Sequence, residues 1–340
     1  MGKLIFIDLR LFEEATTTPV INTTGSSGMS AEMKTFYDRE LLETADPLLI
    51  HDQWAQERDI PKGSGKKIEF RRYEALAKAL TPLTEGVTPA GNKINVTTVT
   101  AEVKQYGDYV TLTDVLILTA IDNNIVEATD LCGSQAGRTL DTVSREYMNA
   151  GTNVQYAEGQ VTSRAALTKD HKLTVKAVKM AVRALKKQNT QRINGVFYGI
   201  IHPDVAFDLT EDEKFIEVTK YKNPERIYKG EIGEIEGVRF SETTEAKIWA
   251  GAGAKIDASG DQKVDVYSTL IFGANAYGTT KVEGGGLETI IKQLGSAGTA
   301  DALNQRATVG WKALKVTEIL SQQYIIRIES ASSFNDGVDN

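Results

Sequence analysis

The chain has 340 residues, 41% of them hydrophobic and 25% charged, which is typical of a folded protein with room for about two domains. Its net charge of −7 argues against a protein that wraps nucleic acid, because such binding depends on many basic residues that displace counterions. A single cysteine, Cys132, excludes an internal disulfide framework, and three scattered histidines predict no metal centre.

The sequence also lacks a segment suited to a membrane and a motif suited to a cofactor. No apolar run approaches the roughly 20 residues that cross a bilayer. Residues 63–67 (GSGKK) look like the end of a phosphate-binding loop, but they lack its first glycine and its Ser or Thr. We therefore expect a soluble protein of a reducing compartment that holds no cofactor and no metal.

The first 60 residues are interpreted as an acidic arm. Residues 31–59 show helical spacing of apolar residues, and residues 1–60 contain 5 Lys and Arg against 11 Asp and Glu, a net charge of −6. Such an arm suits a basic patch on a neighbouring copy of the chain. The acidic residues expected to make this contact are Glu32, Asp38, Glu40, Glu43 and Asp46.

Residues 61–113 reverse the charge, with 8 Lys and Arg against 5 Asp and Glu, and predict a long β ribbon. Residues 67–73 alternate as a strand does, and residues 94–113 form a second β-like run whose apolar phase slips twice. A two-stranded ribbon is not stable alone in water, so we expect a second copy to complete it. The alternative is that the ribbon folds back on its own core.

The basic charge of this segment could serve a neighbouring copy or nucleic acid, or could simply be solvated, and nucleic acid is the least favoured of the three. The tip between the two strands has about 20 residues, which is long for a loop in a compact monomer. The residues expected to contact another copy are Lys66, Lys67, Arg71, Arg72, Tyr73, Leu80, Pro82, Glu85, Val87, Pro89 and Lys93.

Residues 122–150 predict one long helix. Its apolar residues recur at spacings of three and four and form one narrow stripe, which indicates a spine lying on a sheet. At 1.5 Å per residue this helix spans roughly 43 Å. The stripe contains Ile121, Ile125, Cys132, Leu140 and Val143, and Cys132 is expected to be an inert buried thiol.

The remaining sequence predicts an α/β region. A helix at 173–188 has Thr174 available as its N-cap and a basic outer face, which is solvated or contacts an acidic neighbour. A strand at 196–202 leads into a helix at 203–210. Further strands are predicted at 237–243, 264–272, 309–316 and 319–328, the last of them half-buried, and Gly-rich loops at 251–260, 273–286 and 295–298.

One pair of residues could be catalytic. His202 and Asp204 follow an apolar strand, as a general base and its orienting carboxylate would. The favoured interpretation is structural, because Pro203 fits the first turn of a helix and Asp204 complements the helix dipole there. No nucleophile in a strained turn accompanies them, so we predict no catalytic residue.

Several strings of residues resemble major capsid proteins of the coliphage N-four-like family, which have the Hong Kong 97-type phage capsid fold. They are 33–37 (MKTFY), 79–89 (ALTPLTEGVTP), 105–110 (QYGDYV), 133–140 (GSQAGRTL), 200–204 (IIHPD) and 227–233 (IYKGEIG). The resemblance covers about residues 30–330. The order of an arm, a long hairpin, a spine helix, an α/β region and a final hairpin agrees with it.

The resemblance implies an α+β fold with five parts. These are an N-terminal arm (1–60), an extended β-hairpin loop (61–114), a peripheral domain with the spine helix (115–167 and 309–330), an α/β axial domain (168–308) and a tail (331–340). It implies hexamers and pentamers of this chain in an icosahedral shell around double-stranded DNA, assembled in the bacterial cytoplasm and located in the virion. The implied partners are portal, scaffolding and decoration proteins, with DNA contacted weakly and non-specifically.

Two other functions stay open from the sequence. A cellular nanocompartment shell of the encapsulin type shares the fold and encloses enzymes. A hydrolase working through His202 and Asp204 belongs to a different class, and substitution of His202 would abolish its activity.

Overall fold

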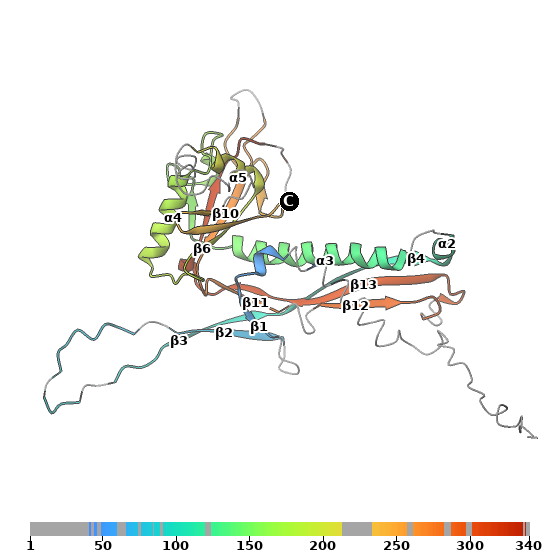
Figure 1. Cartoon of the computed structure of the whole chain (residues 1–340), viewed down its shortest axis with the longest axis horizontal. Coiled ribbons are helices and arrows are strands. Elements are labelled where there is room, and N and C mark those ends of the chain that lie inside the picture. The colour runs from blue at the N-terminus through green and yellow to red at the C-terminus, as the bar shows by residue number, and fades with distance from the viewer. Residues whose placement is uncertain are drawn as a thin grey trace, which may run out of the picture.

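The computed structural model describes residues 41, 44–45, 49–59, 66–73, 76–83, 85–88, 91–119, 124–212, 233–256, 261–281, 287–296, 301–335 and 337. The long helix and the sheet beneath it form an elongated rod, and a compact lobe sits at one end of the rod (Figure 1). A thin ribbon projects below the lobe, beyond its outer side. We use the names rod, lobe and ribbon for these three parts.

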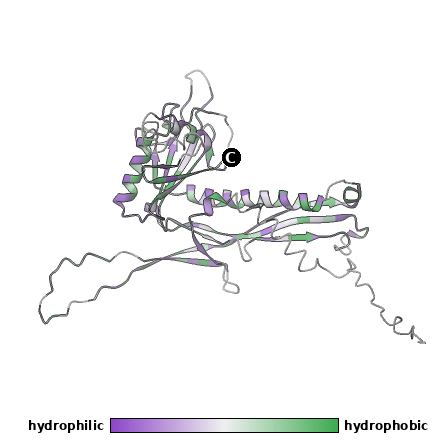
Figure 2. Ribbon diagram, viewed as in Figure 1, coloured by the Kyte–Doolittle hydropathy of each residue, from purple (hydrophilic) through white to green (hydrophobic). Residues whose placement is uncertain are grey.

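The rod is built on α3 (Asn124–Asn149), which confirms the predicted spine helix. Hydrophilic and hydrophobic residues alternate along it, as expected of a helix with one apolar stripe (Figure 2). Beneath it lies a three-stranded antiparallel sheet in the order β12 (Leu287–Lys292), β13 (Arg306–Lys315) and β4 (Lys104–Thr113). The short helix α2 (Asp114–Thr119) follows β4 at the far end of the rod.

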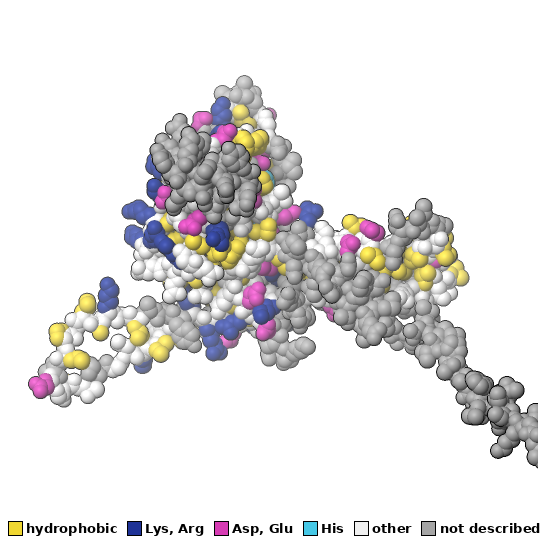
Figure 3. Space-filling model, in the orientation of Figure 1, with side chains coloured by type: hydrophobic (Ala, Val, Ile, Leu, Met, Phe, Trp, Pro, Cys, Tyr) yellow, Lys and Arg dark blue, Asp and Glu magenta, His cyan; other side chains and the backbone are white. Residues whose placement is uncertain are grey.

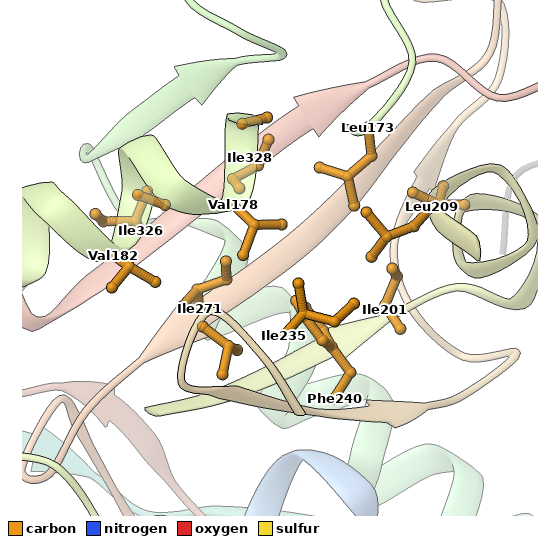
Figure 4. Close-up of a cluster of buried hydrophobic side chains, with 14 of the residues drawn as sticks. Leu173, Val178, Val182, Ile201, Leu209, Ile235, Phe240, Ile271, Ile326 and Ile328 are labelled. Atoms are coloured by element: carbon orange, nitrogen blue, oxygen red, sulfur yellow. The ribbon is translucent and has the colours of Figure 1, made fainter. Parts of the chain in front are cut away.

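The lobe contains a mixed sheet of seven strands. Their order is β5 (Val154–Tyr156), β15 (Ile325–Ser330), β10 (Val266–Phe272), β6 (Phe197–Ile201), β8 (Val238–Glu242) and β7 (Glu234–Ile235), with β9 (Ile248–Trp249) paired to β10. Helices α4 (Val175–Lys187) and α5 (Pro203–Thr210) contribute to one core with these strands (Figure 4).

Local signals explain both helices of the lobe. The side chain of Thr174 accepts a hydrogen bond from the Ala177 amide at 3.2 Å, which confirms it as the N-cap of α4. The predicted strand and helix at 196–210 are confirmed as β6 and α5. His202 caps α5, and Pro203 occupies its first turn.

The run predicted as one strand over 94–113 is two strands with different partners. β3 (Val96–Glu102) pairs with β2 (Lys67–Tyr73) in the ribbon, whereas β4 pairs with β13 in the rod. The second phase slip, between Val103 and Val110, accompanies this change of partner sheet, whereas the first, between Val96 and Val99, lies inside β3. The paired part of the ribbon is seven residues long, much shorter than the predicted run.

The predicted final hairpin does not form. β13 belongs to the rod, β14 (Thr317–Ile319) pairs with β11 (Tyr277–Thr280), and β15 lies inside the lobe between β5 and β10. Consequently β15 is buried on both faces, not half-buried. β5 and β15, which the expected domain bounds group with the spine helix, both lie in the lobe.

Two further sequence predictions are corrected. The Gly-rich stretch 273–286, predicted as a loop, contains the buried strand β11. The arm is not helical over 49–59, because it forms a single turn, η3 (Ile50–Asp52), and then strand β1 (Gln56–Arg58), which pairs in parallel with β11. The other short turns are η4 (Arg164–Ala166) and η6 (Gln322–Tyr324).

The residues after β15 return across the lobe and are tied to it. The Ser332 hydroxyl and the Ser333 amide each donate to Asp208 Oδ2 of α5 at 2.8 Å. The Gly337 amide donates to Asp265 Oδ2 at 2.7 Å. The described part of the expected tail is therefore a strap on the lobe.

Candidate assembly surfaces

The base of the ribbon is anchored on its own chain. Ile68, Phe70 and Ala101 are buried against Val316 and Leu320, which flank β14. The Phe70 ring lies so close to β11 that a Cβ atom at Gly278 would come within 2.5 Å of it, so glycine is required there. The alternative of a ribbon that folds back on its own core is therefore correct for the base.

The tip of the ribbon has no such cover among the described residues. Leu80 and Leu83 are 82% and 77% exposed, although leucine is usually buried in a folded chain. Figure 3 shows hydrophobic side chains spaced around this open loop. The exposed large apolar residues of the tip and its approach to β3 are Leu76, Leu80, Leu83, Val87, Ile94 and Val96.

The basic residues predicted on the ribbon lie in solvent. Lys66, Lys67, Arg71 and Lys93 are exposed and Arg72 is half-buried. The Arg71 guanidinium is 3.8 Å from the Glu69 carboxylate, with both side chains more than half exposed, and such a pair contributes little stability. Pro82 and Glu85 are exposed as well, whereas Pro89 and the side chain of Tyr73 lie outside the described residues.

Sequence reasoning emphasised these charges and missed Leu76, Leu83 and Ile94. The available signal was their position: they are large apolar residues in a Pro- and Gly-containing tip that has no room for a core of its own. The tip is therefore an apolar surface with a few charges at its edges.

The described part of the arm packs on the spine helix through apolar residues. Leu41, Ala45 and Leu49 are buried in the core of the rod with Cys132. Gly133 permits the close approach, since a Cβ there would lie 3.0 Å from the Leu41 carbonyl oxygen. The five acidic contact residues predicted for the arm (Glu32, Asp38, Glu40, Glu43 and Asp46) lie outside the described residues.

The stripe of the spine helix faces the sheet of the rod as predicted. Cys132 and Leu140 are buried and Ile125 and Val143 are half-buried, while Ile121 lies outside the described residues. Burial raises the pKa of the Cys132 thiol, in agreement with an inert thiol. The stripe also includes polar residues that the periodicity did not indicate: Thr129, Asp141, Ser144 and Arg145.

The sheet of the rod carries a hollow of about 670 Å³ that involves all three strands. Two of its glycines permit the close approach of β4 and β13: a Cβ at Gly107 would lie 2.6 Å from the Trp311 carbonyl oxygen, and one at Gly310 would lie 2.7 Å from Tyr109 Cβ. The hollow is lined by residues 105–109, Ile290, Thr308, Gly310, Trp311 and Lys312. Its lining combines apolar residues such as Ile290 and Trp311 with the charged side chains of Asp108 and Lys312.

A second apolar patch lies at the far end of the rod. Val115, Leu116 and Leu118 of α2 are exposed, and so is Leu303. Figure 3 shows hydrophobic side chains gathered at this end, opposite the ribbon. The chain thus carries uncovered apolar residues at two distant places.

The candidate catalytic pair has the geometry of a helix N-terminus. His202 Nδ1 accepts from the Asp204 amide at 3.2 Å, and Asp204 Oδ2 accepts from the Tyr267 hydroxyl at 2.9 Å. Both residues therefore have structural roles at the start of α5. Within the described ranges, no cluster of three His, Cys, Asp or Glu side chains could hold a metal, and no helix is long and apolar enough to cross a bilayer.

Comparisons with known proteins identify the family of this chain. The family described as phage capsid protein matches residues 96–316, well over half of the chain. No curated protein sequence matches it.

Solved structures share the fold at low sequence identity. The capsid structure of cyanophage P-SCSP1u has a TM-score of 0.57 at 15% identity and covers 82% of this chain and 87% of its own. The capsid of Ralstonia phage GP4 has 0.60 at 13%, covering 84% and 87%. The capsid of cyanophage Pam1 has 0.63 at 12%, covering 85% and 92%.

Proposed function

This chain belongs to the phage capsid protein family, and from that premise we propose that its copies assemble as hexamers and pentamers into an icosahedral shell around double-stranded DNA. A major capsid protein is a structural protein of the virion. We propose accordingly that the chain has no catalytic activity. Its net charge of −7 suits a container, because a strongly basic wall would hold the DNA and oppose its packing and release.

The observation that carries this proposal is the ribbon, with its anchored base and uncovered apolar tip. Burial of apolar surface stabilises by about 25 cal/mol per Å². The leucines of the tip are exposed within the described chain, so their apolar surface contributes no such stabilisation there. A neighbouring copy that receives the tip would bury them, and the hollow on the sheet of the rod is a candidate receiving surface.

The finer assignments follow the sequence resemblance. We propose membership of the N-four-like group, with residues 1–60 as the arm, 61–114 as the extended loop, 115–167 with 309–330 as the peripheral domain, 168–308 as the axial domain and 331–340 as the tail. These bounds change where the structure pairs β5 and β15 with the axial strands, and β4 and β12 with the peripheral ones. The contact residues predicted on the loop and the arm keep that role. Portal, scaffolding and decoration proteins are the proposed partners, and assembly is proposed to occur in the host cytoplasm.

Deletion of residues 74–91 tests the role of the ribbon. It leaves residues 92–95 as a short connection between β2 and β3, a length that hairpins use. We expect purified full-length chain to form closed shells in negative-stain electron microscopy, and the deletion variant to stay as folded subunits with unchanged circular dichroism.

Closed shells from the deletion variant would contradict the proposed role of the ribbon. Failure of the full-length chain to form shells under any condition would contradict the function itself. Shells isolated with protein cargo in place of DNA would favour the nanocompartment alternative.

A further inference from the structure

Residues 49–58, here called the bridge segment, contact both the rod and the lobe. The Trp54 ring stacks on Tyr198 of β6 with ring centroids 4.4 Å apart, and β1 pairs with β11. His51 and Asp52 contact α3 and β13 of the rod. The segment therefore joins two bodies that also meet directly along the C-terminal half of α3, where Arg138 pairs with Glu245, Glu146 with Lys247 and Asn149 with Ser268.

The rod side of this joint is a buried cluster of charged and titratable groups. Asp141 of α3 accepts from the His51 amide on Oδ1, and its Oδ2 lies 2.7 Å from His51 Nδ1. Asp52 Oδ2 pairs with Lys315 Nζ of β13, and Asp52 Oδ1 accepts from the Ser144 hydroxyl at 2.7 Å. All four charged or titratable side chains are buried, at 10% exposure or less.

Tyr277 of β11 closes the cluster from the side of the lobe. Its hydroxyl donates to the His51 carbonyl oxygen at 2.6 Å. Burial, together with the nearby charge of Asp52, holds the pKa of Tyr277 well above its ordinary value, so the phenol remains a donor. His51 and Asp52 of the bridge segment thus meet partners from three different elements, α3, β13 and β11, while His51 Nε2 is buried without a hydrogen-bond partner.

A buried ion pair is a weak source of stability, because the loss of hydration offsets much of the attraction. Its distinctive property is that it depends strictly on the relative position of the two charged groups. Apolar side chains tolerate a shift of an ångström, whereas a displaced carboxylate would leave Lys315 charged, buried and unpaired. An ion cluster at a joint therefore selects one relative position of the two bodies.

We propose that the bridge segment fixes the angle between rod and lobe, and that Asp52, Lys315, His51 and Asp141 are positioning residues that select this angle. One consequence rests on the proposed function: subunits that all have the same angle between rod and lobe assemble into shells of one curvature. The angle itself is a property of the single subunit and can be measured without assembly.

The test replaces the pair with apolar residues of similar size, Asp52→Leu with Lys315→Met. Spin labels at Glu127→Cys on α3 and Arg183→Cys on α4, both exposed positions, report the distance between rod and lobe in unassembled full-length subunits. Cys132 is buried, so we expect it not to react with the label. We expect a narrow distance distribution in the parent protein and one at least twice as wide in the double variant.

The matched control is the exposed pair Lys255–Asp261 on the lobe, whose charged atoms are 3.3 Å apart. Lys255→Met with Asp261→Leu should leave the distribution unchanged. Hydrogen exchange of the amides of residues 50–58 monitors docking: we expect at least tenfold faster exchange in Asp52→Asn, which leaves Lys315 unpaired, and near-parent exchange in the double variant.

A distribution as narrow in the double variant as in the parent would overturn the proposal, and so would a broad distribution in the parent. Shell formation by the parent is a separate measurement that bears only on the proposed function. If shells form, the double variant should give particles with a wider range of diameters than the parent or the control.

Discussion

The lobe and the tip of the ribbon contain similar apolar residues and differ in what covers them. In the lobe, Ile201, Ile271 and Ile328 are fully buried between the sheet and its helices. In the tip, Leu80 and Leu83 are exposed and touch no core. The lobe therefore derives its stability from its own chain, whereas the apolar surface of the tip can stabilise only a complex. Substitutions in the two regions should separate folding from assembly.

The largest effect is expected from Ile271→Ala in the lobe. Removal of a fully buried isoleucine side chain leaves a cavity and costs about 2–5 kcal/mol of the free energy of unfolding. Urea unfolding of the subunit measures this loss. A change below about 1 kcal/mol would show that the lobe does not depend on this core.

Leu80→Ser in the tip should weaken assembly and leave the stability of the subunit unchanged, the opposite of Ile271→Ala. We expect the free energy of unfolding to change by less than about 0.5 kcal/mol, as at other exposed positions. Each subunit contact should lose about 1.5–3 kcal/mol, because burial of a leucine contributes that much. The subunit concentration at which shells appear should therefore rise at least tenfold by light scattering. A lower free energy of unfolding with an unchanged assembly concentration would show that Leu80 stabilises the subunit and not the contact between subunits.

Asp208→Asn tests the strap that closes the lobe. Burial raises the pKa of Asp208, but hydrogen bonds from Ser333 and Ser332 and the charge of Lys172 outweigh it and bring the pKa below its ordinary value. This stabilisation is present above the unfolded pKa of about 3.9 and is lost as the pH falls through the lower folded pKa.

We therefore expect Asp208→Asn to cost about 1.5 kcal/mol at pH 7, the contribution of a hydrogen bond to a charged group. The variant should also show a weaker loss of thermal stability as the pH falls below about 4, because only there does the unfolded carboxylate of the parent take up its proton before the folded one. Parallel pH profiles for parent and variant would exclude Asp208 as the titrating group.

The smallest effect is expected from Arg71→Glu with Arg72→Glu on the ribbon. Both residues lie at the surface, so the subunit should unfold as the parent does. Assembly should weaken by less than about 1 kcal/mol per contact and more at low salt than at high salt, because screening shortens the reach of surface charges. Lys186→Glu with Lys187→Glu on α4 is the control. Assembly without salt dependence would remove the proposed role of these charges.

The parts of the fold that could be predicted from sequence are those with local signals. The spacing of Cys132, Ala136 and Leu140 on one stripe indicates α3, and Thr174 marks the start of α4. Strand pairing could not be predicted. β4 pairs with β13, about 200 residues later, and nothing near either strand specifies the other.

Glycine explains another failure of prediction. The glycines of 273–286 predict a loop, yet one of them, Gly278, lies in strand β11 and is needed there because Phe70 of the ribbon packs on it. For the candidate site, the lack of cover over the tip could be predicted from the length of the loop and its composition. The joint between rod and lobe could not, because His51, Asp141 and Lys315 converge only in three dimensions.

The position of β15 between β5 and β10 in the lobe's sheet has a consequence for biosynthesis. During translation, β5, β6, β8 and β10 emerge from the ribosome before β15. Until β15 is made, the edges of β5 and β10 that pair with it have no partner strand. A nascent chain cannot close this sheet until residue 330 has been made. Prematurely terminated products would therefore lack a complete lobe. We expect proteases to degrade such chains before they are incorporated into a particle.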